Sequence, residues 1–222
     1  LMLRLGCSEV EHISNNATGQ FISLFPVRLP ATSVPLNARL DFLKAEINSQ
    51  EEKPLLMKAL DRALCTTNFI RFGGDVTIGH QTYTFYDPYN LKEVEPYITG
   101  CLDLLQSEID SKTEYSDACI KMLASNFRAL NSFGLFDLIM PRVENVAQML
   151  NYEWNDLLHV LHFARKDAET RVYAQHLESV KQLIAKLSKT DFVSRFAQVE
   201  SYECNDYLGI SDKEHNEIVN KK

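Results

Sequence analysis

The fold is decided by residues 36–65, which read LNARLDFLKAEINSQEEKPLLMKALDRALC. Apolar side chains recur here every three to four residues, the spacing that places them on one face of an α-helix. Two stripes result: Leu36, Leu40, Leu43 and Ile47, then Leu56, Leu60, Ala63 and Leu64. Pro54 suits a first helical turn, and the acidic residues before it complement the positive end of a helix dipole. The pattern predicts two consecutive helices, over about 36–48 and 52–65.

The same spacing continues through most of the remaining chain. It predicts a helix that begins near Asn90, which with Glu93 resembles a capping box, and another that begins near Thr113. Further helices are predicted over 135–150, 154–161 and 167–188 and from Thr190. Pro141 predicts a kink or two short helices over 135–150, because proline removes a backbone hydrogen bond. Consecutive helices with short connections are typical of bundles and helix-repeat solenoids. We therefore expect a mainly α protein, built as a multi-helix array or an irregular bundle, with HEAT- or TPR-like superhelical packing as one form of it.

Two regions interrupt the helical pattern. Leu1, Leu3 and Leu5 alternate as in a short strand, and three prolines between residues 26 and 35 favour an extended chain. Strand-favouring residues on both sides of a turn at 79–81 predict a small β-hairpin near 75–86. We expect an extended or irregular N-terminal segment over 1–35, a helical domain over 36–210 with a hairpin insertion at 69–90, and a frayed tail over 211–222.

The composition of the chain argues against several classes of protein. The 222 residues are 45% hydrophobic and 24% charged, which is typical of a globular chain, and the net charge of −7 argues against binding to nucleic-acid phosphates. No apolar run is long enough to cross a membrane. Five scattered cysteines without C-x-x-C spacing are typical of reduced, buried thiols. We expect a cytoplasmic protein that binds neither nucleic acid nor membrane. Since it starts at Leu1, we also expect a piece of a longer polypeptide.

The residues that could hold a metal are Asp156, His159 and His162, spaced three apart on one predicted helix. This spacing brings them onto adjacent turns, where a metal or an acid–base pair could form. The competing interpretation is that both histidines are half-buried helix residues, and no third strong ligand lies nearby in the sequence. The pattern favours the second interpretation, and we predict no bound cofactor or metal.

An aromatic group follows the hairpin turn: Tyr83, Phe85, Tyr86 and Tyr89. Aromatic side chains anchor many protein interfaces, so the group is a candidate interaction surface. The alternative, which we favour, is that these rings seal the hairpin onto the helices.

Several short stretches resemble one family. They are ALDRAL at 59–64, TNF at 67–69, Arg71, Gly73, DPY at 87–89, Glu93 and Tyr97, preceded by LPAT at 29–32 and by Arg39 and Leu40. Together they are similar to a helical region of large bacterial multidomain proteins of the STAND or NTPase type, some of which act against phage. Asn68 and Asp87 stand where that pattern has histidine and tryptophan. The resemblance covers about residues 24–105 and implies a sensor or scaffold region without an active site of its own.

The expected function is therefore a non-catalytic helical scaffold or sensor region that mediates protein–protein recognition within a larger bacterial protein. Its partner would be another protein or a flanking domain of the same chain. The absence of a nucleophile elbow and of a phosphate-binding loop favours this assignment over an enzyme. Two alternatives remain: a small all-α enzyme or metal-binding protein that uses His159 and His162, and an oligomerisation module.

Overall fold

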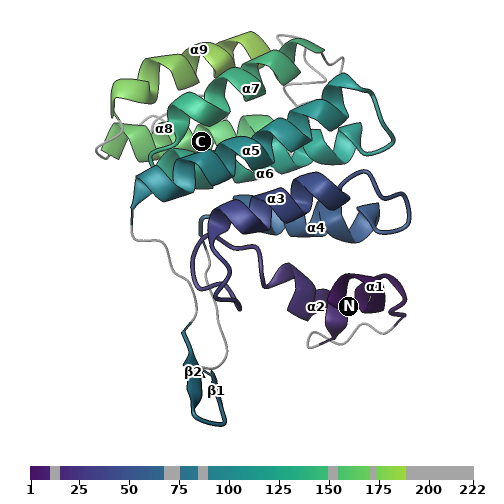
Figure 1. The fold of residues 1–222 in the computed structure, drawn as a ribbon. Coiled ribbons are helices and arrows are strands. Elements are labelled where there is room, and N and C mark those ends of the chain that lie inside the picture. The colour runs from purple at the N-terminus through teal and green to yellow at the C-terminus, as the bar shows by residue number, and fades with distance from the viewer. Residues whose placement is uncertain (11–15, 68–75, 85–89, 150–154, 171–173, 189–222) are drawn as a thin grey trace, which may run out of the picture. The chain divides into compact units, whose positions relative to one another are not determined.

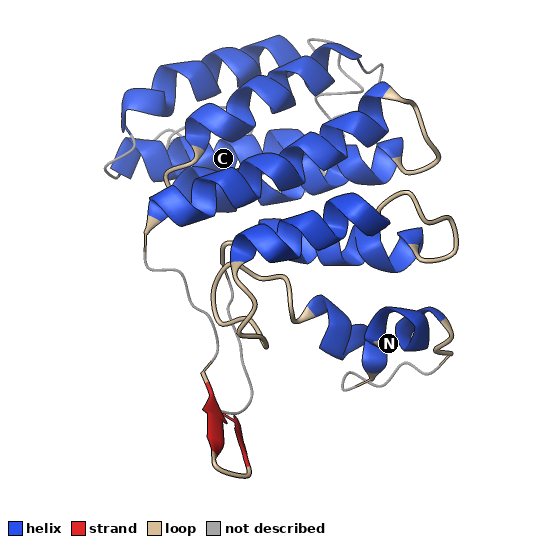
Figure 2. Cartoon of the chain, viewed as in Figure 1, coloured by secondary structure: helices blue, strands red, loops and turns tan. Residues whose placement is uncertain are grey.

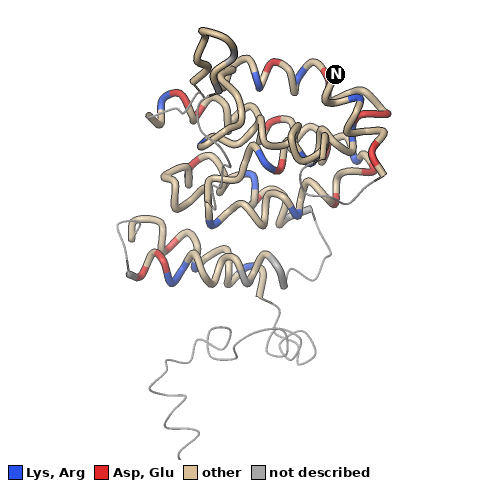
Figure 3. Tube along the Cα trace, turned by 90° about the horizontal axis from the view of Figure 1, so that it is seen from below, with Lys and Arg blue, Asp and Glu red and all other residues tan. Residues whose placement is uncertain are grey.

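A computed structural model describes residues 1–10, 16–67, 76–84, 90–149, 155–170 and 174–188. Helices make up 71% of the described residues, and the sheet in this part of the chain is a single two-stranded hairpin (Figure 2). The mainly α prediction is confirmed. Lys and Arg are interspersed with Asp and Glu along the described helices (Figure 3). No helix among the described residues is both long and apolar enough to span a bilayer.

The chain divides into two compact units, residues 1–142 and 143–222. The division falls inside a helix, between residues 142 and 143. It reflects the distribution of long-range contacts, which local periodicity does not report.

The first unit is a series of helix pairs, and their order along the chain is also their order of packing (Figure 1). Its helices are α1 (Met2–Cys7), α2 (Ala17–Ile22), α3 (Leu36–Glu46), α4 (Lys53–Leu64), α5 (Leu91–Asp110), α6 (Ser116–Ser132) and the beginning of α7 (Phe136–Met149). Helix α1 packs on α2, α2 on α4, both α3 and α4 on α5, and α5 on α6. The predicted stripes form the shared core, in which Leu60, Ile98 and Leu105 are completely buried.

The expectation of an extended segment over 1–35 is wrong for two stretches, which form α1 and α2. Long-range contacts stabilise these short helices. The Glu9 carboxylate accepts hydrogen bonds from the backbone N–H groups of Ala17 (2.6 Å) and Thr18 (2.9 Å) at the start of α2. Gly6 is buried so tightly that a Cβ there would lie 2.6 Å from Leu55 Cδ2 in α4. The alternation of Leu1, Leu3 and Leu5 therefore does not indicate a strand.

The hairpin prediction is confirmed. Strand β1 (Val76–Ile78) pairs antiparallel with β2 (Gln81–Tyr83), and Gly79 adopts φ +64° at the turn. Residues 81–84 are all exposed.

The structure also tests the predicted cap at the start of α5 and the predicted effect of Pro141 on α7. The side chain of Asn90 accepts from the Glu93 N–H (3.0 Å) and donates to the Glu93 carboxylate (2.7 Å), so the predicted cap at the start of α5 is present. Helix α7 continues through Pro141 as one element, so the alternative of two short helices is wrong.

The second unit comprises the end of α7 from Val143, then α8 (Asn155–Thr170), the 3-10 turn η1 (Ala174–His176) and α9 (Leu177–Leu187). Helices α8 and α9 pack against each other. The prediction of one helix over 167–188 is wrong, because α8 ends at Thr170 and α9 begins at Leu177. The helices expected after Thr190 and the tail over 211–222 lie outside the described residues.

Candidate functional site

The described part of the first unit contains an open groove between α1, the segment 23–35 and α3, with a volume of about 500 Å³. Three phenylalanines contribute to its lining: Phe21, Phe25 and Phe42. Their ring centroids are 5.1–6.2 Å apart, and Phe21 meets both other rings edge to face. Such contacts are favourable for aromatic pairs and give this wall of the groove a defined shape.

One side of the groove is a ridge along α3 and the residue pair before it. Val34, Ala38, Phe42 and Glu46 recur every four residues, and all four line the groove. Val34 is 43% exposed and Phe42 is 38% exposed. The opposite face of α3, with Leu36, Leu40 and Leu43, is buried in the array. In the described structure, helix α3 therefore has a buried apolar face and, opposite it, a second apolar strip that is exposed, formed by Ala38 and Phe42.

Two buried polar side chains hold the segment 23–35 in place. Arg39 is 3% exposed, and its guanidinium donates to the carbonyls of Val34 (2.7 Å) and Pro26 (2.9 Å). The Tyr97 hydroxyl, from α5, donates to the carbonyl of Phe25 (2.7 Å). Burial raises the pKa of Tyr97, so the hydroxyl stays a donor. The bonds to Pro26 and Phe25 are buried and satisfy carbonyl groups that this irregular segment would otherwise bury without these donors.

The rim of the groove carries charge of both signs. Arg4 comes from α1, Glu46 from the end of α3, and Glu52 from the residue before α4. Within the described residues, neither carboxylate pairs with a basic side chain of the protein. Their charges are therefore available to a ligand in the groove.

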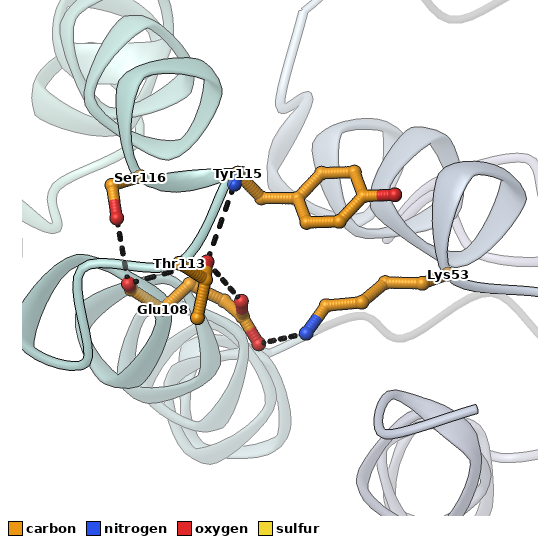
Figure 4. Close-up of polar contacts among 5 residues, drawn as sticks. All are labelled: Lys53, Glu108, Thr113, Tyr115 and Ser116. Carbon is orange, nitrogen blue, oxygen red and sulfur yellow. Dashed lines mark hydrogen bonds and ion pairs between the residues drawn. The ribbon is translucent and has the colours of Figure 1, made fainter. Parts of the chain in front are cut away.

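A separate polar cluster joins α4, α5 and α6 (Figure 4). Glu108 is 6% exposed, and its carboxylate pairs with Lys53 Nζ (2.8 Å) and accepts from the Thr113 hydroxyl (2.6 Å). The Ser116 hydroxyl donates to the Glu108 carbonyl (2.9 Å), and the ammonium of Lys53 lies 5.4 Å from the centre of the Tyr115 ring. These polar groups bind one another, so we assign the cluster a structural role and not a catalytic one.

The metal hypothesis remains a prediction. Asp156, His159 and His162 all lie on α8, and the side chain of His162 is buried, with 6% of the residue exposed. The side chains of Asp156 and His159 are outside the described part of the structure. Where side chains are described, no group of three or more His, Cys, Asp or Glu residues is arranged to hold a metal ion.

Only one member of the aromatic group can be placed. Tyr83 is 42% exposed, and its hydroxyl donates to Gln81 (3.1 Å) in the same strand. Its ring therefore does not seal the hairpin onto the helices. Phe85, Tyr86 and Tyr89 lie outside the described residues.

The described cysteine thiols differ in their exposure. Cys101 and Cys119 are buried as predicted, whereas Cys7 is exposed and Cys65 is partly exposed. Burial, and next the Glu108 carboxylate, raise the pKa of Cys119 to about 12, so this thiol is not an activated nucleophile. Cys204 is not described.

Sequence reasoning missed the groove and both residues that shape it. Arg39 and Tyr97 appeared only as positions in a family resemblance. A signal was present in the spacing of Val34, Ala38 and Phe42, which is a second apolar stripe on a helix whose first stripe was already assigned to the core.

Comparison with family models, with curated proteins and with solved structures gave no match. Function is therefore inferred from the geometry of the groove.

Proposed function

We propose that this chain is a non-catalytic helical scaffold or sensor region of a larger cytoplasmic bacterial protein, and that it receives a protein partner in the groove between α1 and α3. The observation that carries the proposal is the uncovered apolar ridge of Val34, Ala38 and Phe42 beside a defined cavity.

The ridge would contribute binding energy through the burial of Phe42. With 38% of Phe42 exposed, roughly 75 Å² of this side chain remains accessible, and its complete burial is worth about 2 kcal/mol. Aromatic anchors in preformed pockets dominate many protein interfaces. Helix arrays suit such a role, because each pair packs on its neighbours and leaves one surface free for a ligand.

Site-specific photo-crosslinking in cells tests the proposal. Phe42→p-benzoylphenylalanine places the reactive group in the groove. The same substitution at Asp41 is a matched control, because Asp41 is exposed on the same helix and does not line the groove. We expect a reproducible adduct with one protein from position 42 and none from position 41. That protein, once purified, should bind the intact chain and lose at least tenfold in affinity to the Ala38→Glu variant. Absence of an adduct at position 42, or equal labelling from both positions, would refute the proposal.

A further inference from the structure

We infer that the occupant of the groove is an amphipathic α-helix with basic side chains at the end that meets Glu46 and Glu52. This inference rests on the proposed function and names the chemistry of the partner.

The helical form of the occupant follows from the ridge. Residues at positions i, i+4 and i+8 form the ridges by which one helix packs into the grooves of another. Ala38, Phe42 and Glu46 form such a ridge on α3, and the eight steps from Ala38 to Glu46 correspond to about 12 Å along the helix. A partner helix of about two turns matches this length.

An extended peptide fits less well. Strand addition gains its affinity from main-chain hydrogen bonds to an exposed sheet edge. Here two of the walls, α1 and α3, are helices, whose backbone groups largely bond within the helix itself, and the third wall, the segment 23–35, is irregular and offers no sheet edge. A helical ligand needs no main-chain bonds to the receptor, since its own backbone is already satisfied.

The charge of the occupant follows from the rim. Glu46 ends the ridge and Glu52 lines the same groove, and in the described structure neither forms an ion pair with a basic side chain. Lysine or arginine in the first turn of a partner helix would complement them, and so would the positive end of that helix's dipole. Arg4, on the α1 side, complements an acidic group of the same ligand.

The test uses two fluorescein-labelled helical peptides and the full chain. Both peptides carry leucines on one face. One has two lysines in its first turn, and the other has two glutamates at those positions. Fluorescence anisotropy should show that the lysine peptide binds about five- to tenfold more tightly, as expected for two partly exposed ion pairs.

Variants of the chain then assign this preference to the groove. The double variant Glu46→Lys with Glu52→Lys should reverse the preference of the two peptides. Phe42→Glu and Ala38→Glu should each weaken both peptides at least tenfold. Ala38 is exposed, so its variant remains informative even if Phe42→Glu folds poorly. Equal binding of the two peptides, or an unreversed preference, would overturn the inference.

The crosslinking experiment separates this inference from the proposed function. If position 42 captures a protein partner but the lysine peptide does not compete with it, the helical occupant is wrong and the recognition role stands. If the adduct is a second copy of this chain, the inference of a separate partner helix is wrong. Absence of any adduct at position 42 refutes the proposed function itself.

Discussion

The hydroxyl of Tyr97 offers the sharpest test of how the groove is held. Tyr97 is 1% exposed, and its hydroxyl donates to the carbonyl of Phe25, 72 residues earlier in the chain. The substitution Tyr97→Phe removes this donor and keeps the ring that fills the core. It leaves the carbonyl of Phe25 buried without this partner, in the segment that forms one wall of the groove.

The cost follows from the burial of the carbonyl. An exposed hydrogen bond contributes little, but a buried acceptor that loses its donor costs the desolvation of that group, about 1–3 kcal/mol. For a chain of this length, each kcal/mol shifts the melting temperature by about 2–4 °C. A central value of about 2 kcal/mol therefore predicts a decrease of about 4–8 °C.

The assay is thermal unfolding followed by circular dichroism at 222 nm, with Tyr83→Phe as the matched control. Tyr83 also donates a hydrogen bond, to Gln81, but it is 42% exposed, so water replaces the lost partner. We expect a change of less than about 0.5 kcal/mol for the control. Equal effects of the two variants would refute the reasoning that burial of the Phe25 carbonyl sets the cost.

Three further perturbations test other parts of the structure. Lys53→Met leaves the buried Glu108 carboxylate without its cation and should destabilise the chain by about 3–5 kcal/mol, measured by urea unfolding. Gly100→Ala places a Cβ 2.4 Å from Leu40 Cδ2, so thermal unfolding should show a loss of about 1–3 kcal/mol despite the gain of about 1 kcal/mol in helix propensity. The raised pKa of Cys119, about 12 in the folded state against about 8.5 unfolded, contributes stability that is complete below about pH 8.5 and is lost as the pH rises towards 12. The expected slope in denaturant titrations at successive pH values is at most about 1.4 kcal/mol per pH unit, and Cys119→Ala should reduce it.

Each of these expectations has a control in the chain. Asp103→Asn removes the ion pair with Arg142, in which the side chain of Asp103 is 61% exposed, and should cost less than about 1 kcal/mol. A loss as large as that of Lys53→Met would contradict the role of burial. In a Leu40→Ala background the clash at Gly100 is absent, so Gly100→Ala should become stabilising. A pH profile that Cys119→Ala leaves unchanged would show that other groups cause the alkaline loss.

Much of the helical architecture could be predicted because its causes are local. The stripe of Leu36, Leu40 and Leu43 identifies a helix from one short window, since its spacing alone selects the face that is buried. The cap formed by Asn90 and Glu93 is equally local, because both residues belong to the same turn.

Other features depend on residues far apart in the chain. Helix α1 forms where an alternating pattern suggested a strand, and its Gly6 packs closely against Leu55 in α4, 49 residues later. The helix expected over 167–188 is divided, and no local periodicity marks the break. The metal hypothesis for His159 and His162 depends on what the fold brings beside α8, which their spacing does not report.

The spacing of apolar residues and the capping residues were thus sufficient to predict a mainly α chain with a small hairpin. The groove was decided by tertiary packing alone. Arg39 and Tyr97 reach across 13 and 72 residues to the carbonyls of Pro26 and Phe25, and these bonds leave one apolar face of α3 uncovered beside a cavity. A buried carbonyl needs a hydrogen-bond donor, and the donor can come from any residue that the fold brings close to it. The sequence pattern does not report distances between residues far apart in the chain, so it could not identify these donors.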